Sequence, residues 1–444
     1  MKWGAGTIMF SCALSLGVDR PVIHPPPSVA IRRPPWNQFP PIDGFAHGHC
    51  VCPSARSSNS FPFPFFVARF RAFLKGNLMK TTIGALKRAI KKVLKAVDCA
   101  SCAIKVESGA LSVIAMSAQA SVKILVPAQG NAGDCCAVIG AKQAGAILGS
   151  VLDCTECTIE AIEQGAQLVF GGARIKLMRP AGANDGIDLF DAPADGDKRV
   201  VFETSGRDFA GLMAGPVQYA AKSDVRYYLV GVHATCDAGA LRLTGSNGFM
   251  LCTAAGAIDA SASMVDCIVP HTAADSIGAV FGADERITVC QLGKDANLRL
   301  LMHSETIQWN TALVAGKFPD FRRVMPGPKR IGQCKLSRDA LSAAVSRVLA
   351  ASGDVFVALH LTRKGLEVRS VDGEQCEVFA TDTSVDKDVR VTVTGQLLVQ
   401  AIDALETPAV QLSLDGKDQH AKIVLNPVEG TVKDWLGFLM QAKV

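Results

Sequence analysis

The feature of this 444-residue chain that most restricts its fold is a pattern of strands and helices that occurs three times. Three stretches with the alternating apolar pattern of paired strands begin at Ala110, Ala240 and Gly365; they read "ALSVIAMSAQASVKIL", "ALRLTGSNGFMLCTA" and "GLEVRSVDGEQCEVFA". A helix-like stretch precedes each of them and another follows. Such a repeat indicates several similar units rather than one large core.

The spacing of the repeats sets the size of each unit. The second helices begin near Gly140, His271 and Gly395, so the repeats are 131 and 124 residues apart. This is too long for a solenoid, whose units have about 20–45 residues. Each second helix leads into a hairpin pattern with Gly near its centre, as tight turns favour. We therefore expect an α+β fold of three similar domains, each ordered strand, helix, strands, helix, strands, with the bounds 79–198, 199–330 and 331–444.

Residues 1–78 have a different composition. They hold 11 of the 21 prolines and 9 of the 20 phenylalanines. Proline at this density prevents regular helix and sheet, so we interpret the segment as a disordered extension, with Met79 opening the folded protein. A faint resemblance to a signal or transit peptide keeps a targeting role open. Eight Lys/Arg against two Asp in this segment account for the formal charge of +5, which leaves 79–444 close to neutral.

Two Cys-x-x-Cys pairs raise the alternative of a zinc or redox protein. They are Cys99/Cys102 and Cys154/Cys157, and the 51 residues between them exceed the usual gap of a zinc ribbon. Other cysteines alternate within apolar strands, as small core residues do; examples are Cys236, Cys252 and Cys290. We expect reduced thiols in a cytoplasmic protein with no metal and no cofactor. No apolar run reaches 18 residues, so no membrane span is expected either.

The first helix of the first repeat carries an unusual charge. In "IGALKRAIKKVLKAV" an apolar stripe follows helical spacing through Leu86, Ile90, Val93 and Val97. Five bases and no acid occupy the rest of it, although exposed helices normally mix charges of both signs. A helix facing nucleic-acid phosphates explains this best, and a solvated face is the plainer alternative. The bases are Lys87, Arg88, Lys91, Lys92 and Lys95.

The corresponding helices of the other repeats are less basic. The second carries Arg207 and Lys222 at its ends, with Pro216 expected to kink or end it. The third carries Arg338 and Arg347. We expect the same face of each repeat to point at DNA, with the first repeat dominating.

Two strings in the middle of the chain carry a family resemblance. "DVRYYLVG" (Asp224–Gly231) precedes the hairpin through "TGSNGFMLC", and "GKFPDFRRVMP" (Gly316–Pro326) follows later. The second matches the string Gly-x-Phe-Pro-Asp-Tyr-Arg-Arg-Val of one family almost residue for residue. With the threefold repeat, these strings make 79–444 resemble the bacterial DNA polymerase III β sliding clamp. The resemblance is strong in the middle domain and rests mainly on the pattern elsewhere.

The resemblance implies a non-enzymatic ring, a head-to-tail homodimer that encircles duplex DNA of any sequence and tethers a polymerase. It also implies a groove between the second and third domains in which the polymerase and the clamp loader dock an apolar peptide. Tyr227 and Tyr228 lie beside it and are candidates for stacking on single-stranded DNA. The groove residues are Leu229, Ser246, Gly248, Phe249, Met250, Leu251, Pro319, Arg323, Val324, Phe438 and Met440.

The sequence departs from the family in three places. Asn247 to Leu251 stand where the family has Asp-Gly-His-Arg-Leu, and Gln441-Ala442 replaces Pro-Met. We expect these changes to leave the groove more apolar at one point and less constrained at another. The subunit interface implied by the resemblance pairs Ile175 and Leu177 with two small residues, which would weaken the dimer; they are Ala350 and Ala351. A DNA-associated scaffold that forms no ring is the alternative from another class.

Overall fold

The computed structural model describes residues 78–130, 133–183, 198–237, 239–260, 266–293, 298–416, 421–429 and 434–442. All of these residues belong to one unit, Pro62–Val444. The expected extension of residues 1–78 lies outside the described residues, except that Leu78 begins the first strand. No helix of the described part is long and apolar enough to cross a membrane.

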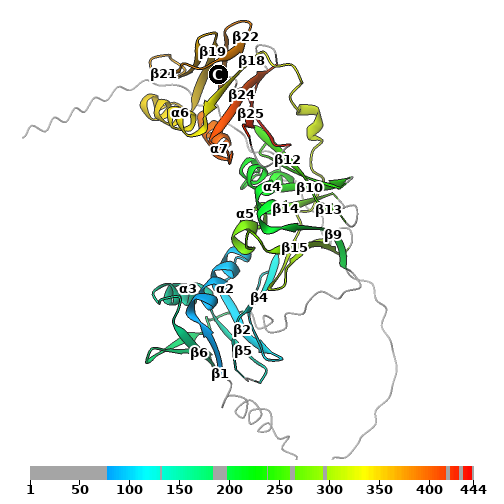
Figure 1. Cartoon of the computed structure of the whole chain (residues 1–444), viewed down its shortest axis with the longest axis vertical. Coiled ribbons are helices and arrows are strands. Elements are labelled where there is room, and N and C mark those ends of the chain that lie inside the picture. Colours follow the sequence, from blue (N-terminus) through cyan, green and yellow to red (C-terminus); the bar gives the residue numbers. More distant parts are fainter. Residues whose placement is uncertain are drawn as a thin grey trace, which may run out of the picture. The chain divides into compact units, whose positions relative to one another are not determined.

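The chain forms three repeats, as the sequence pattern predicts (Figure 1). The first contains β1 (Leu78–Thr82), α2 (Ile83–Ala96), β2 (Ser101–Glu107), β3 (Ala110–Met116), β4 (Ala120–Val126), β5 (Cys135–Gly140), α3 (Ala141–Gly149), β6 (Glu156–Ile162), β7 (Gly165–Phe170) and β8 (Ala173–Met178). The second contains β9 (Lys198–Ser205), α4 (Gly206–Tyr219), η3 (Tyr227–Leu229), β10 (Gly231–Asp237), β11 (Ala240–Ser246), β12 (Met250–Ala257), β13 (Asp259–Ala260), β14 (Cys267–Pro270), α5 (His271–Val280), β15 (Arg286–Leu292), β16 (Arg299–His303), β17 (Ile307–Ala312) and η5 (Phe321–Val324). The third contains β18 (Gly332–Ser337), α6 (Arg338–Ser352), β19 (Phe356–Thr362), β20 (Gly365–Arg369), β21 (Cys376–Phe379), β22 (Thr383–Val385), β23 (Val389–Thr394), α7 (Gly395–Asp403), β24 (Ala409–Asp415), β25 (Lys422–Pro427) and β26 (Leu436–Met440). The predicted α+β class and its three similar units are confirmed, and the domain bounds stay a prediction.

Each repeat begins its first helix in the same way. Thr82, Ser205 and Ser337 end the first strand of their repeats, and the hydroxyl of each accepts a hydrogen bond from a backbone N–H three residues on. This N-cap satisfies a donor that the first turn leaves free, and replacing it costs about 1 kcal/mol. The repeated strand–cap–helix unit therefore has a local cause in the sequence.

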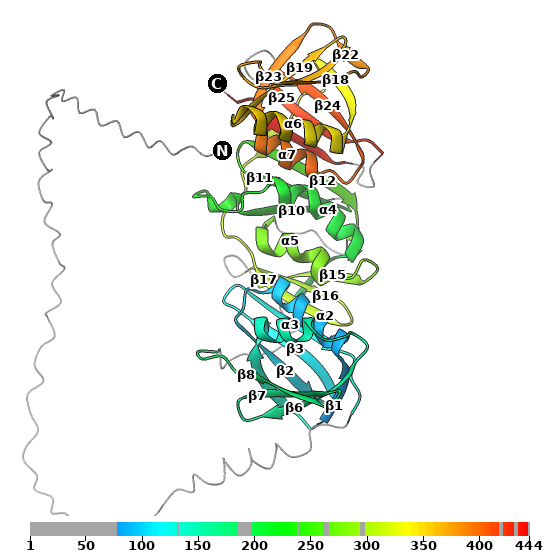
Figure 2. The same cartoon turned by 90° about the vertical axis from the view of Figure 1, so that its left-hand side faces the viewer.

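The helices pack as pairs against the sheets (Figure 2). In α2 the predicted stripe of Leu86, Ile90 and Val93 is fully buried, and so is Val97 at its C-cap. Pro216 does not end its helix: it lies inside α4, which continues to Tyr219, and the alternative of a kink stays a prediction. Ala220 donates to the Pro216 carbonyl, so helical hydrogen bonding resumes after the proline.

Backbone pairing joins each repeat to the next. β17 of the second repeat pairs with β4 of the first, and β26 of the third pairs with β12 of the second, both antiparallel. Each junction thereby lies inside a nine-stranded sheet. Helices cross the same junctions, since α2 contacts α5 and α4 contacts α7. Two four-stranded sheets complete the fold, with β8 and β21 each at an edge.

Aromatic packing fills the second junction. Trp435, just before β26, meets Tyr219 of α4 edge to face, with ring centroids 6.1 Å apart. The Tyr219 hydroxyl donates to the Ala401 carbonyl of α7. Gly215 allows the indole to approach α4, because a Cβ at this position would lie 2.2 Å from Trp435 Nε1.

We predict that Gly215→Ala destabilises the protein, because overpacking at the indole costs about 1–3 kcal/mol. Gly211→Ala is the matched control: it lies in the same helix, and its Cβ would meet nothing within 4 Å. That control gains up to about 1 kcal/mol of helix propensity. Urea unfolding followed by circular dichroism measures both; equal stability of the two variants would contradict the packing argument.

Candidate functional site

The string that carries the family resemblance forms one wall of a pocket. Residues 317–326 run past the second junction as an extended segment that contains the short helix η5. Asp320 caps η5 by accepting a hydrogen bond from the Arg322 N–H. Phe321 packs against two small apolar clusters, one around Phe318 and Leu229 and the other around Phe438. The wall is therefore fixed to both the second and the third repeat.

The pocket has a volume of about 280 Å³ and gathers almost the whole predicted groove. Ten of the eleven predicted residues line it; these are Leu229, Ser246, Gly248, Phe249, Met250, Leu251, Pro319, Val324, Phe438 and Met440. Arg323 is not among the lining residues; its side chain is 84% exposed and its Nε lies 3.3 Å from the Asp320 carboxylate. The lining also includes Arg226, Tyr228, Phe318, Asp320 and Phe321, which the sequence prediction did not assign to it. All five lie within the two strings that carry the resemblance, so proximity in sequence could have indicated them.

The pocket has a buried floor and an apolar rim. Met250, Leu251 and Phe438 are at most 4% exposed, so they belong to the core as well as to the pocket. At the rim Phe249 is 63% exposed and Met440 is 36% exposed. Exposed apolar side chains around a preformed hollow are typical of a binding site.

Hydrogen bonds attach the C-terminal end of the rim to the third repeat. Gln441 donates its backbone N–H to the Ala421 carbonyl and accepts from the Ala421 N–H through its side-chain oxygen. Ala442 donates its N–H to the Thr392 carbonyl. The expected loss of constraint relative to the family's Pro-Met stays a prediction.

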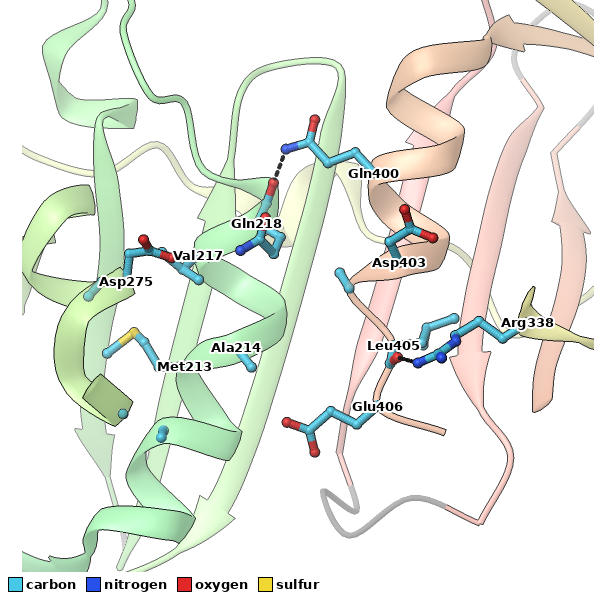
Figure 3. Close-up of a pocket in the computed structure, with 14 residues that line it drawn as sticks. Met213, Ala214, Val217, Gln218, Asp275, Arg338, Gln400, Asp403, Leu405 and Glu406 are labelled. Carbon is cyan, nitrogen blue, oxygen red and sulfur yellow. Dashed lines mark hydrogen bonds between the residues drawn. The ribbon is translucent and has the colours of Figure 1, made fainter. Parts of the chain in front are cut away.

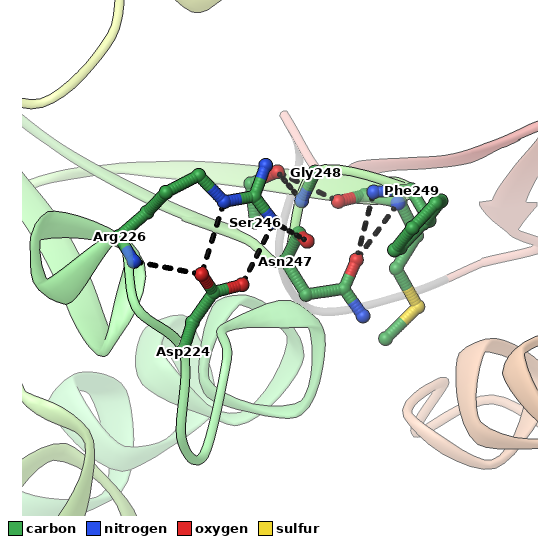
Figure 4. Close-up of polar contacts among 7 residues, drawn as sticks. Asp224, Arg226, Ser246, Asn247, Gly248 and Phe249 are labelled. Carbon is green, nitrogen blue, oxygen red and sulfur yellow. Dashed lines mark hydrogen bonds and ion pairs between the residues drawn. The ribbon is translucent and has the colours of Figure 1, made fainter. Parts of the chain in front are cut away.

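A hydrogen-bonded turn carries Phe249 at the pocket edge (Figure 4). The Asn247 side-chain oxygen accepts from the N–H groups of Phe249 and Met250, both at 3.0 Å. Gly248 has φ +88, a conformation that favours glycine, and a Cβ there would lie 2.6 Å from Arg226 Nη1. Arg226 packs beneath the turn and donates to the Asn247 carbonyl at 3.0 Å.

Asp224 fixes Arg226 in this position. Its carboxylate accepts from the Arg226 backbone N–H and from Nε and Nη2, at 2.8, 3.0 and 2.7 Å. Hydrogen bonds from Arg226 lower the pKa of Asp224 to about 2. The bidentate ion pair thus links the loop before η3 to the turn that carries Phe249.

The bases of α2 fall into two groups. Lys87 Nζ lies 3.0 Å from Asp153, and Lys92 Nζ lies 3.8 Å from Glu285 of the second repeat. The remaining three bases are exposed and form no ion pair with a described carboxylate; they are Arg88, Lys91 and Lys95. Two of the five predicted bases are therefore paired within the chain, and three have no ion pair with a described carboxylate; their contact with DNA stays a prediction.

The predicted bases of the other repeats are mostly paired too. Arg207 lies 3.0 Å from Asp284, and Arg338 lies 2.7 Å from Asp339. Arg347 forms a bidentate ion pair with Glu377. Lys222 is exposed and has no described carboxylate within 4 Å. Their positive charge is thus largely offset within the chain.

Beside the groove, Tyr227 is 57% exposed and meets Tyr228 edge to face.

Three of the four predicted interface residues have accessible surface. Ala350 and Ala351 are exposed at the end of α6, and Ile175 is partly exposed on β8. Leu177 is corrected: it is fully buried in the core of its own repeat, so it offers no surface to another chain. Ile175 and Leu177 are two residues apart and share one face of β8, and Leu177 lies where the core covers that face completely.

The cysteine pairs do not form a metal site in the described residues. No group of three or more His, Cys, Asp or Glu suited to a metal ion occurs there. Burial raises the pKa of Cys102 to about 12 and that of Cys157 to about 11, which suppresses thiolate formation. Cys236, Cys252 and Cys290 are buried, as predicted for core residues.

A second hollow of about 570 Å³ lies on the helical side, between α4 and α5 and the third repeat (Figure 3). Met213 and Val217 line it together with the carboxylates of Asp275, Asp403 and Glu406. The Gln400 side chain crosses the junction and donates to the Gln218 carbonyl. Asp403 accepts from Ser342 at 2.7 Å. The hollow belongs to the packing of the second junction.

We predict that the Asp224 carboxyl titrates near pH 2, well below the ordinary value of 3.8, and that Arg226→Gln moves its midpoint upwards. Because the folded-state pKa is lowered, the stabilisation is present above about pH 3.8 and is lost as the pH falls towards 2. Carboxyl NMR, with the resonance assigned by Asp224→Asn, follows the titration. A midpoint near 3.8 in the unsubstituted protein would show that the ion pair does not form.

Comparison with known proteins places this site in a family context. No family model matches the chain. It is 25% identical to the beta sliding clamp of Vibrio cholerae over 220 residues, which cover 49% of this chain and 59% of that protein. It is 32% identical to the beta sliding clamp of Proteus mirabilis over 202 residues, or 44% of this chain and 53% of that protein. The chain thus matches a little over half the length of these relatives.

Solved structures extend the similarity in fold. The DNA polymerase III beta subunit of Thermotoga maritima superposes with a TM-score of 0.71 at 19% identity, covering 83% of this chain and all of that one. A sliding clamp of Pseudomonas aeruginosa bound to griselimycin gives a TM-score of 0.70 at 18% identity, with the same coverage. The chain therefore has the fold of the bacterial β sliding clamps and resembles them in sequence over the matched stretch, as its motifs predicted.

Proposed function

We propose that this protein is a DNA sliding clamp, a non-catalytic ring that encircles duplex DNA and tethers a polymerase during processive synthesis. The observation that carries the proposal is the repetition of one junction. At each internal junction the last strand of one repeat (β17 or β26) pairs with a strand of the preceding repeat (β4 or β12). The second helix of the same repeat (α5 or α7) contacts the first helix of the preceding one (α2 or α4). At the two ends of the series the same elements have no such partner among the described residues: β8 and α3 in the first repeat, β21 and α6 in the third.

The internal junctions define a common register. In the first junction Gln308 of β17 lies opposite Lys123 of β4. In the second, Leu436 of β26 lies opposite Thr253 of β12. These two pairs occupy the same places in their repeats, counted along the hydrogen-bonded ladders from the capped first strand and from the strand before the second helix.

Carried over to the ends of the series, the same register would bring Arg174 of β8 opposite Cys376 of β21 in a second chain. It also places Lys176 opposite Glu374, so the basic edge strand meets an acidic side chain. α3 would meet α6 of the second chain, as α5 meets α2 and α7 meets α4 within one chain. Head-to-tail pairing of this kind forms a ring when the rotation closes, and two chains give six repeats.

DNA binding is assigned to the unpaired bases of α2. A ring holds DNA by enclosure, so it needs only weak, sequence-independent phosphate contacts. Arg88, Lys91 and Lys95 are exposed and lie on one side of the helix, whereas Lys87 and Lys92 serve as anchors to acidic side chains. Lys222 adds an unpaired base in the second repeat. Tyr227 and Tyr228 remain candidates for stacking on single-stranded DNA.

The pocket beneath Phe249 is the proposed docking site for the polymerase and the clamp loader. Its apolar floor and rim suit the apolar side chains of an extended peptide. Arg226 and Tyr228 supply polar groups at its edge for backbone carbonyls. The Pseudomonas aeruginosa clamp has been crystallised with griselimycin, which is therefore a suitable probe for ligand binding by this chain.

A disulfide tests the ring and its register together. We predict that Arg174→Cys, oxidised under mild conditions, forms a covalent dimer through Cys376, because residues directly opposite in antiparallel strands approach within disulfide range. Oxidation in the presence of a circular plasmid should yield protein that stays on the DNA in high salt and is released when the plasmid is cut once. Ile175→Cys, whose side chain points to the other face, and Arg174→Cys with Cys376→Ser are controls that should not cross-link. A monomer in sedimentation, with no cross-link, would favour the scaffold alternative.

The bases of α2 should account for the salt dependence of DNA binding. Replacing Arg88, Lys91 and Lys95 by Gln is expected to reduce the slope of log affinity against log salt by about 0.9 for each phosphate that the variant no longer neutralises. The matched control replaces Arg207 and Arg347, whose charges Asp284 and Glu377 already offset, and should leave the slope nearly unchanged. Equal effects of the two variants would contradict the division into paired and unpaired bases.

A further inference from the structure

A buried imidazole lies directly behind the wall of the pocket. His233 of β10 stacks flat on Phe318, with ring centroids 4.8 Å apart and an interplanar angle of 1°. It also meets Phe321 edge to face, with centroids 6.3 Å apart. Both phenylalanines line the pocket, whereas His233 itself does not. The wall residues therefore rest on a side chain that can acquire a charge.

The surroundings of His233 favour its neutral form. Its side chain is 12% exposed, and its strand neighbours are Thr244 of β11 and Ile268 of β14, neither of which carries a charge. Burial lowers the pKa of His233, and the charge of Arg322 lowers it further. Asp266 acts in the opposite direction from a carboxylate 3.8 Å from Nε2.

We propose that neutral His233 is a positioning residue for the ligand groove, and that its protonation releases the Phe318–Phe321 wall and weakens binding. This inference rests on the proposed role of the pocket as a docking site. An imidazolium in this position needs water or a counter-charge. Asp266 supplies a counter-charge at the solvent side, being 76% exposed, so the ring is drawn away from Phe318.

Displacement of Phe318 and Phe321 would affect the whole groove, because both side chains pack against other groove residues. Phe318 is only 6% exposed and cannot follow the imidazole without opening its cluster. Phe321 packs against that cluster and against the one around Phe438, which forms the floor of the pocket. A change at His233 is thus transmitted to both repeats that form the groove.

The direction of the pH dependence follows from the lowered pKa. The unfolded chain binds the proton near the ordinary value of 6.5, and the folded chain binds it only at lower pH. The stability of the fold falls as the pH drops from about 6.5 towards the folded-state pKa. The wall itself needs the neutral ring of the folded chain, so it is supported above the folded-state pKa and loses support as the pH falls through and below it. Binding by the groove should weaken below the same folded-state pKa.

Methyl and imidazole NMR of the full chain between pH 5 and 8 tests the positioning role without any ligand. The methyl resonances of Val324 and Leu229 are expected to shift with the titration midpoint of the His233 ring, below 6.5. In His233→Phe, which keeps a flat ring for stacking, these shifts should disappear. His360→Gln changes a histidine outside the groove and should leave them as they are. The proposal would be overturned if the Val324 and Leu229 methyl shifts did not follow the titration midpoint of His233, or if they still titrated in His233→Phe.

Griselimycin titrations at about pH 7.5 and about pH 5.5 test the effect on binding. Affinity should fall at the lower pH, by about tenfold for each unit below the His233 pKa, and should be the same at both values in His233→Phe. Equal affinity of the unsubstituted chain at the two pH values would overturn the pH effect. A chain that fails to bind at either pH would instead count against the docking site, and the NMR result would still decide whether His233 positions the wall.

Discussion

The pairing of edge strands between successive repeats is the interaction on which the other features depend. β12 supplies Met250 and Leu251 to the groove, and β26 supplies Phe438 and Met440, so the pocket exists only where these strands pair. The same pairing sets α4 beside α7 and α2 beside α5. Backbone ladders between repeats resist sliding, because a shift of one residue would turn every core side chain outwards.

Much of the fold was predictable because it is local and repeated. Strand alternation, capped helix starts and glycine turns are encoded within a few residues, and three occurrences reinforce one another. The groove was predictable for a different reason: its residues lie in two strings that resemble a family. Phe318 and Phe321 were missed although they belong to one of those strings; the structure brings four consecutive residues, Phe318 to Phe321, to the pocket, which no strand or helix period predicts.

What the sequence did not indicate are contacts between distant segments. Lys87 meets an acid 66 residues away, and Lys92 meets Glu285 of another repeat, so neither pair follows from helical spacing. Ile175 and Leu177 share one face of β8, so burial of Leu177 depends on how far along the strand the core extends. The stacking of His233 on Phe318 joins β10 to a segment that no periodicity connects with it. Ionic and aromatic contacts of this kind depend on the tertiary fold rather than on local propensity.

The paired and unpaired bases of α2 also bear on how fast an enclosed duplex could move. The stretch from Arg88 to Lys95 rises only about 10 Å along the helix axis, since each residue adds about 1.5 Å. A duplex carries one phosphate per about 1.7 Å of its axis, so such a short stripe can touch only a small part of the charge that passes it. Each contact is then shallow and readily exchanged for the next. Resistance to sliding along the DNA axis would be low, and residence on the DNA would depend on enclosure by the ring rather than on the strength of the phosphate contacts.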